Sequence, residues 1–351
     1  MNRFVILILF LFFIQVTGCI ETIDFDTNRT GNQLVVDGGV IDRPGSYELR
    51  LSLTSEETNV PEPLSGTQVT IVDGDGNREE YIESEPGLYL LHGNTVRGVR
   101  GQSYHIEIRL FDGSFYRSVP ETIPTAIGRD SSYFEVGTIE EQSASGRMIE
   151  RPAVLIFTDT ELPDQNKPVW LRWRVENVYS FREGLSPVGL EPRTCYVAGH
   201  VEPQRITLFH NSDLNTGEIT GRLMAMKQVI MHEFFIRHYF NVIQFSITEQ
   251  RHRYLEKVEE MINRTGTIFD TPPATIRGNV YNMEDEDEMV LGYFEAAAVD
   301  TSRTFTVRGD FDFYIPNPCG SSSSNTPQNA CRNCINIPNS TRERPFYFGQ
   351  P

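Results

Sequence analysis

The sequence predicts a mainly β protein, with an immunoglobulin-like β-sandwich first and a second β-rich domain after it. Two observations carry this prediction. Short apolar runs alternate with polar residues at the period of a half-buried strand, and clusters of Gly, Pro, Asn and Asp separate these runs. Only the stretch at about 246–265 repeats its apolar residues at the period of an α-helix.

Residues 1–18 are predicted to be a lipoprotein signal peptide. Arg3 precedes an apolar run, residues 4–14, that is too short to span a membrane and has the length of a secretory h-region. The run leads into Val16-Thr17-Gly18-Cys19, which resembles the lipobox of bacterial lipoproteins. In such signals the cysteine receives fatty acyl chains such as palmitate and becomes the mature N-terminus, so Cys19 is the predicted lipidation site. The alternative is an ordinary signal peptide with a coincidental cysteine.

The composition and charge disfavour two classes of partner, nucleic acid and anionic lipid. Without residues 1–18 the chain has 333 of its 351 residues and a net charge of −18, because Arg3 is the only charged residue removed. Typical domains have about 100–200 residues, so two domains are expected. Such an acidic chain is a poor partner for nucleic acid and for anionic lipid. Membrane attachment is therefore expected to rest on the lipid, with residues 19–32 as an acidic tether.

The first domain is predicted at 33–124. Its apolar residues alternate most clearly in 47–53 and 104–110. Asp112-Gly113 has the composition of a hairpin turn, and roughly seven short strands in about 90 residues are typical of a β-sandwich. The Pro-flanked stretch 120–124 is the predicted boundary. The strand segments are expected at 33–41, 47–53, 69–71, 89–91, 104–110 and 115–116.

The second domain is predicted at 125–316 and contains one helix. Ser246 and Glu249 have the spacing of a capping box, and Gly266 is the predicted stop. The helix presents one apolar face, formed by Tyr254, Leu255, Val258, Met261 and Ile262. The strand segments are expected at 132–140, 153–159, 169–179, 196–201, 228–237, 239–247, 275–281, 289–298 and 304–308.

Four cysteines remain when Cys19 is assigned to the lipid, and an even number in an exported protein indicates disulfides with three possible pairings. Disulfides that tie the irregular tail 317–351 to itself or to the body are the preferred interpretation. The C-x-x-C near the C-terminus lacks the strand–helix context of a redox motif. A zinc site fits the ligand type, but its C-x11-C-x2-C spacing does not fit paired zinc knuckles. The candidate disulfide residues are Cys195, Cys319, Cys331 and Cys334.

Motifs for catalysis and for cofactors are missing from the sequence. It contains no G-x-S-x-G elbow and no phosphate-binding loop. His232-Glu233 lacks the second histidine, at position 236, that a zincin helix needs. Hard cations prefer clustered carboxylates, but the acidic run 284–288 has no calcium-loop spacing, and 73–77 has hairpin chemistry. We therefore expect a solvated loop and a turn, no cofactor, no metal and no enzymatic activity.

Two tryptophans lie in the aromatic-rich stretch WLRWRVENVYSF. Trp170 and Trp173 are three residues apart, so a regular strand directs them to opposite faces. One is expected in the core, and the other is a candidate for a partner surface, where Trp, Tyr and Arg are enriched. Core packing of both is the alternative.

Three segments resemble a family of Bacteroidota outer-membrane lipoproteins of unknown function. They are LVVDGGVI (34–41), FDTPPATIRGNVY (269–281) and VLGYFEAAA (290–298). The resemblance runs over nearly the whole mature chain and is strongest in 30–125 and 245–300. Members are often encoded beside TonB-dependent receptors of the starch-utilisation type, which implies a barrel partner at the outer membrane. The family offers no catalytic residues to carry over.

The functional expectation follows from the lipid and the resemblance together. It is a lipid-anchored, surface-exposed accessory or ligand-binding subunit of a TonB-dependent-type barrel or other outer-membrane complex. Glu21, Asp24 and Asp26, just after Cys19, are compatible with the surface export that the resemblance implies. A stand-alone cell-surface adhesin or binding module is the alternative, and a secreted hydrolase is the third hypothesis.

Overall fold

The computed structural model describes ten stretches of the chain. Cys19 and the predicted signal peptide and tether lie outside the described residues, as do the Ser-rich stretch 321–324 and residues 269–274 of one segment that carries the family resemblance. The described residues are mainly β, as the sequence predicts. They are 33–55, 60–125, 127–143, 145–162, 167–184, 191–201, 206–211, 217–263, 275–320 and 329–349.

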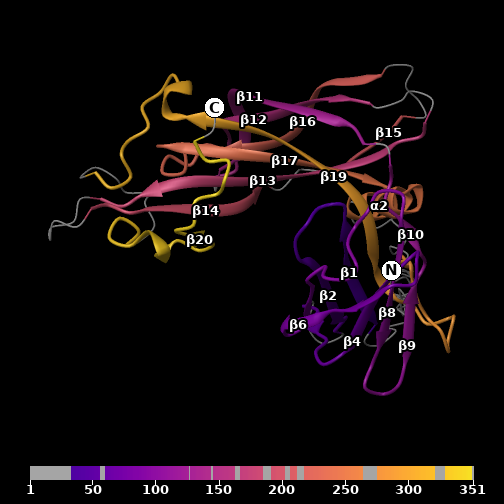
Figure 1. The fold of residues 1–351 in the computed structure, drawn as a ribbon. Coiled ribbons are helices and arrows are strands. Elements are labelled where there is room, and N and C mark those ends of the chain that lie inside the picture. The colour runs from indigo at the N-terminus through magenta and orange to yellow at the C-terminus, as the bar shows by residue number, and fades with distance from the viewer. Residues whose placement is uncertain are drawn as a thin grey trace, which may run out of the picture.

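The described chain forms two lobes that share one long strand, β19 (Leu291–Val307), which crosses from one lobe into the other (Figure 1). The N-terminal lobe contains β1 (Leu34–Ile41), β2 (Tyr47–Leu53), β3 (Glu62–Pro63), β4 (Gln68–Asp73), β5 (Arg78–Glu80), β6 (Ile82–Glu85), β7 (Leu88–Leu91), β8 (Ser103–Arg109), β9 (Phe115–Ser118), β10 (Glu121–Thr122) and β18 (Val280–Asn282). The C-terminal lobe contains β11 (Arg129–Gln142), β12 (Met148–Glu161), β13 (Trp170–Arg182), β14 (Thr194–Val201), β15 (Thr207–His210), β16 (Glu218–Gln228), β17 (Arg237–Ile247), α2 (Glu249–Asn263), the 3₁₀ turns η2 (Arg308–Asp310) and η3 (Cys334–Asn336), and β20 (Ser340–Thr341).

The largest sheet runs through both lobes in the order β20-β14-β13-β17-β19-β1-β2-β7-β6, with β15 beside β13 and β3 beside β2. The first part of β19 pairs in parallel with β1, from Leu291 opposite Val35 to Ala297 opposite Ile41. Its second part pairs antiparallel with β17. The strand therefore joins the sheet of one lobe to the sheet of the other without a break.

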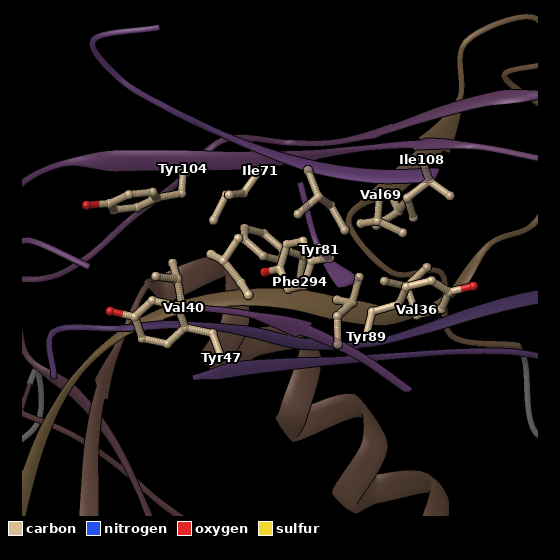
Figure 2. Close-up of a cluster of buried hydrophobic side chains, with 14 of the residues drawn as sticks. Val36, Val40, Tyr47, Val69, Ile71, Tyr81, Tyr89, Tyr104, Ile108 and Phe294 are labelled. Carbon is tan, nitrogen blue, oxygen red and sulfur yellow. The ribbon is translucent and has the colours of Figure 1, made fainter. Parts of the chain in front are cut away.

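The core of the N-terminal lobe lies between two facing sheets (Figure 2). Alternate side chains of β4 and β8, such as Ile71 and Tyr104, face those of β1 and β2, such as Val36. Phe294 of β19 is fully buried in the same core. Residues from beyond position 279 thus complete this core, while the predicted division at 33–124 and 125–316 and the immunoglobulin-like topology stay predictions.

The C-terminal lobe is also layered. The three-stranded sheet β11-β12-β16 packs on one face of β13 and β17, where Ile156, Met224, Trp173 and Phe240 are buried together. Helix α2 covers the opposite face near the junction of the lobes, with Leu255 buried against the sheet. The period-2 pattern of the strands produces these faces, because successive side chains point to opposite sides.

Three details of the elements differ from the sequence expectation. Residues 229–236, within the predicted strand 228–237, are not in a strand: 231–236 form turns and bends, in which Phe234 is buried in the core of the C-terminal lobe. The predicted strands 289–298 and 304–308 are one strand, β19. Of 275–281, only Val280 and Tyr281 are in a strand, the short β18.

Helix α2 is confirmed, but its cap differs from the prediction. Ser246 lies inside β17 and is buried, so it cannot cap the helix. Thr248 occupies the capping position instead, and its Oγ1 accepts a hydrogen bond of 3.2 Å from the backbone N–H of Arg251. The helix thus starts directly after β17, which places Arg251 in its first turn at the junction of the lobes.

Candidate functional site

Strands β1 and β19 approach each other closely at the junction of the lobes. A Cβ atom on Gly39 would lie 2.1 Å from the carbonyl oxygen of Glu295, and one on Gly292 would lie 1.9 Å from that of Val36. Gly292 also has a φ of 80°, which favours glycine. These glycines belong to two of the segments that carry the family resemblance, 34–41 and 290–298.

The segment 269–281 also contacts β19 at the junction of the lobes. Asn279, just before β18, donates from Nδ2 to the carbonyl oxygen of Phe294 at 2.9 Å. Its Oδ1 accepts from the N–H of Phe294, also at 2.9 Å. The described parts of the segments 34–41 and 269–281 therefore lie against the remaining segment, 290–298, which contains the first part of β19.

A groove of about 610 Å³ opens at this junction, and we call it the junction groove. Ligand-binding pockets in proteins commonly have volumes of about 300–1,000 Å³. Strands β1, β13, β17 and β19 and the first turn of α2 all contribute to it. Its lining includes Gly38, Gly39, Arg172, Phe245, Arg251 and Glu295.

A buried ion-pair triad lies in the junction groove. Arg172 donates to Glu295 through Nε at 3.1 Å and through Nη2 at 2.5 Å, and Arg251 donates through Nε at 2.6 Å. The Glu295 side chain is only 8% exposed. Burial alone raises the pKa of Glu295, but the two guanidinium groups outweigh burial and lower it to about 2. The carboxylate is therefore ionised at neutral pH.

Aromatic rings hold both guanidinium groups in place. Arg172 lies 3.7 Å from the ring centroid of Phe245, and Arg251 lies 4.8 Å from that of Tyr293. Cations over aromatic faces are attracted by the ring quadrupole. The triad carries a net charge of +1 within a strongly acidic protein, and it presents fixed N–H donors to the groove.

A second hollow of about 620 Å³ lies beside the junction groove, between the 120–125 segment and the start of α2. Glu121 lines it and is 1% exposed. Its carboxyl group accepts hydrogen bonds from Thr248 Oγ1 at 2.6 Å and from the Tyr293 hydroxyl at 2.5 Å. Burial raises the pKa of Glu121 despite these two donors. The predicted boundary stretch thus contains a buried polar link between the lobes.

The two tryptophans lie on opposite faces of β13, as the sequence predicts. Trp173 is 4% exposed, packs in the core and donates from Nε1 to Asp130 at 2.8 Å. Trp173 is thus the tryptophan that lies in the core, as expected for one of the two. Trp170 is half-buried against the apolar cluster beneath α2 and lines the second hollow. Its role at a partner surface stays a prediction.

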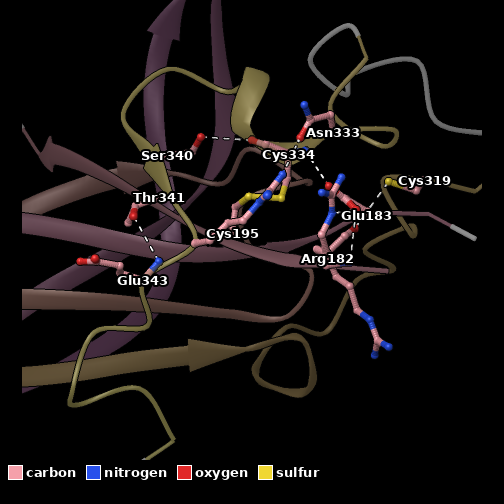
Figure 3. The surroundings of a disulfide bond; sticks show 11 residues. Arg182, Glu183, Cys195, Cys319, Asn333, Cys334, Ser340, Thr341 and Glu343 are labelled. Carbon is pink, nitrogen blue, oxygen red and sulfur yellow. Dashed lines mark hydrogen bonds and ion pairs between the residues drawn. A yellow bond between two sulfur atoms is a disulfide. The ribbon is translucent and has the colours of Figure 1, made fainter. Parts of the chain in front are cut away.

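The four candidate cysteines form two disulfides, Cys195–Cys334 and Cys319–Cys331. Cys195 and Cys334 are fully buried, and Figure 3 shows their surroundings. Glu183 stabilises this region because its carboxylate accepts from the N–H of Cys334 at 3.1 Å and from Nε of Arg193 at 3.0 Å. The tail is thus tied both to β14 and to itself, and the four sulfur atoms are used in disulfides rather than in a zinc site.

The two carboxylate-rich segments form hydrogen-bonded turns. Asp73 Oδ1 accepts from the N–H of Asn77 at 2.9 Å in the β4–β5 hairpin. Asn282 Oδ1 accepts from the N–H of Glu284 at 2.8 Å, and Glu288 accepts from the Tyr116 hydroxyl at 2.8 Å. Within the described stretches, no three His, Cys, Asp or Glu side chains are grouped to hold a metal ion.

The histidines of the incomplete zincin pattern lie in different elements. His232 lies in the turns before β17, and His238 lies within β17, with Nε2 2.8 Å from Nδ2 of Asn177. His238 is fully buried, and burial lowers its pKa well below the usual value. It is a core residue of the strand rather than one of two ligands on a helix face.

Sequence reasoning missed the triad because its members come from three distant segments. One local signal was available. Glu295 is the single charged residue in the apolar run from Val290 to Ala298, and a charge in such a run is almost never fully buried unless it is paired. Nothing local identifies Arg172 and Arg251 as its partners.

The fold and the groove define a mainly β protein with a charged site where its two lobes meet. The chain belongs to the family described as a domain of unknown function, DUF4249, whose model matches residues 20–303, or 284 of the 351 residues. Neither the curated proteins nor the solved structures contain a match to the chain. Among the residues that the structure describes, no helix has the length and apolar character needed to cross a membrane.

Proposed function

We propose that this protein is a lipid-anchored binding subunit of an outer-membrane complex, facing the cell exterior and working with a TonB-dependent-type barrel protein. The observation that carries the proposal is Val16-Thr17-Gly18-Cys19 directly after a short apolar run. The family match supports it, because the matched region begins at residue 20, immediately after Cys19. The Bacteroidota origin and the barrel partner are proposed from the family resemblance. The role is binding rather than catalysis.

Two groups of arginine and aromatic side chains on the C-terminal lobe support the proposed protein partner. Arg303 lies 4.8 Å from the ring of Tyr347 and 5.3 Å from that of Phe346, and Arg308 lies 5.1 Å from that of Tyr314. Phe346 is 76% exposed and Tyr314 is 73% exposed. Arg and aromatic residues are enriched at protein interfaces. We propose these arginine–aromatic groups as contacts with the partner, in addition to the candidate Trp170; Trp173 is not proposed because it is buried in the core.

Purification in mild detergent from the native host tests the partner. The proposal expects a barrel protein to co-purify in stoichiometric amount, and recovery of the protein alone would instead favour the stand-alone adhesin. The double variant Tyr314→Ala, Phe346→Ala is expected to reduce co-purification. Phe111→Ala is the matched control, because Phe111 is 88% exposed but lies in the other lobe. Equal losses in both variants would contradict the proposed contacts.

A further inference from the structure

We infer that the junction groove binds a small organic anion, whose carboxylate or phosphate group is recognised by the guanidinium groups of Arg172 and Arg251. This inference deepens the proposed function and rests on it only in treating the protein as a binding subunit. It names the chemical class of ligand and the residues that hold it. The two residues belong to β13 and α2, which meet at the groove.

The first argument is the unbalanced charge of the triad. Two guanidinium groups share the single carboxylate of Glu295, and the side chains of Arg172, Arg251 and Glu295 are 19%, 12% and 8% exposed. Removing a charge from water is costly unless an opposite charge compensates it. One positive charge of the triad has no such partner within it. An anion in the groove compensates this charge.

The second argument is the set of unused hydrogen-bond donors. A guanidinium group has five N–H donors in a rigid, planar fork. Arg251 uses only Nε on Glu295, and Arg172 uses Nε and Nη2. Within the described chain, Nη1 and Nη2 of Arg251 and Nη1 of Arg172 have no hydrogen-bond acceptor. Carboxylate and phosphate oxygens fit such a fork in a bidentate manner.

The third argument is preorganisation. The side chain of Arg172 is held between Glu295 and the ring of Phe245, and that of Arg251 between Glu295 and the ring of Tyr293. A ligand therefore meets donors that are already oriented, which reduces the entropy lost on binding. Gly38 and Gly39 of β1 also line the groove, and the backbones of β2 and β19 pack closely against them.

The charges at the rim restrict the ligand to a small one. Glu176 pairs with Arg174 at 2.8 Å, and Glu48 lies 3.8 Å from Arg50. Asp37 is exposed at the rim and adds one negative charge. The net charge of −18 expected for the mature chain also repels long polyanions. A ligand with one or two acidic groups that fits a groove of about 610 Å³ is compatible with the negative charges at the rim and with the acidic chain.

The test is isothermal titration calorimetry of the full-length mature lipoprotein in detergent at low salt, with three separate probes. Succinate reports on carboxylates, inorganic phosphate on phosphates, and succinamide is the uncharged counterpart of succinate. We expect succinate or phosphate to bind and succinamide not to bind, and the stronger of the two anions identifies the source of the acidic group. Binding of neither anion at millimolar concentration, or equal binding of succinamide, would overturn the inference.

Arg251→Gln is the decisive variant, because it leaves the neutral pair Arg172–Glu295 in place. Its affinity for the anion is expected to fall at least about tenfold, which corresponds to about 1.4 kcal/mol. Arg253→Gln is the matched control on the same helix, with a side chain that is 70% exposed and paired with Glu249. The control is expected to bind like the wild type. An unchanged affinity in Arg251→Gln, or an equal loss in Arg253→Gln, would contradict the assignment.

Arg251→Lys provides a second variant that keeps the charge and removes the planar fork. We expect its affinity to lie between those of the wild type and Arg251→Gln, with a melting temperature close to that of the wild type. Wild-type affinity in Arg251→Lys would refute the bidentate contact. Failure of these binding tests would not contradict the proposed function, because lipidation and co-purification with a barrel protein are measured without the probes.

Discussion

Arg172 and Glu295 lie 123 residues apart in the sequence, yet two hydrogen bonds join their side chains in the junction groove. The pair connects β13 of the C-terminal lobe to β19, the strand that both lobes share. Arg251 adds a second guanidinium group from the first turn of α2. The triad thus ties the sheet, the helix and the junction of the lobes to one buried carboxylate.

Replacing Glu295 is expected to destabilise the fold strongly. Glu295→Gln leaves two largely buried guanidinium groups without a counter-charge, and breaking a buried pair from one side costs about 3–5 kcal/mol. Urea unfolding followed by circular dichroism measures the change. Glu260→Gln, on the exposed side of α2, is the control and is expected to change the free energy of unfolding by less than about 0.5 kcal/mol. Equal stability of both variants would show that the triad does not hold the junction.

The same carboxylate makes stability depend on acidic pH. The folded-state pKa of Glu295, about 2, lies below the usual 4.5, so its ionised form stabilises the fold above pH 4.5. This contribution is about 3 kcal/mol and is lost as the pH falls from 4.5 towards 2. The difference in unfolding free energy between wild type and Glu295→Gln is therefore expected to narrow over this range. A constant difference would contradict the lowered pKa.

Gly39 is expected to tolerate no side chain. A Cβ at this position would lie 2.1 Å from a backbone oxygen of β19, so Gly39→Ala forces the parallel pair β1–β19 apart. Such overpacking typically costs about 1–3 kcal/mol. Gly309→Ala is the control, since its Cβ would meet nothing within 4 Å. Melting temperatures that fall equally in the two variants would argue against the close approach of the strands.

The two disulfides are expected to contribute differently to stability. Cys195–Cys334 closes a loop of 139 residues and Cys319–Cys331 one of 12 residues. In the chain-entropy model these loops correspond to about 5 and about 3 kcal/mol. The double variant Cys195→Ser, Cys334→Ser should therefore unfold at lower urea concentration than Cys319→Ser, Cys331→Ser. The reverse order would count against this loop-entropy explanation.

The strands were largely predictable, because alternation with a period of two survives in most of them. In β2 and β8, alternate side chains are buried, as the sequence pattern indicates. The non-strand stretch 229–236 was missed because Val229 and Phe234 are buried there, as they would be in a strand. The sequence predicted two strands in place of β19 because the polar residues in its middle, such as Ser302, are typical of a loop. In the structure Ser302 hydrogen-bonds to Ser132 of β11.

The site was not predictable, and the reason is physical. A buried ion pair needs partners that the fold brings together, and periodicity describes only neighbours along one element. Trp170 and Trp173 drew attention to β13, but the residue between them that matters is Arg172. The predicted lipidation site, Cys19, differs, because the prediction rests on a local sequence motif.

Metabolic labelling with radioactive palmitate in the native host tests the central claim, the lipid anchor, most directly. The wild-type protein is expected to carry the label and to sediment with the outer membrane. Cys19→Ala should carry no label and should leave the outer-membrane fraction, while the control Cys319→Ser, Cys331→Ser keeps its label. An unlabelled wild-type protein, or label that persists in Cys19→Ala, would contradict the account.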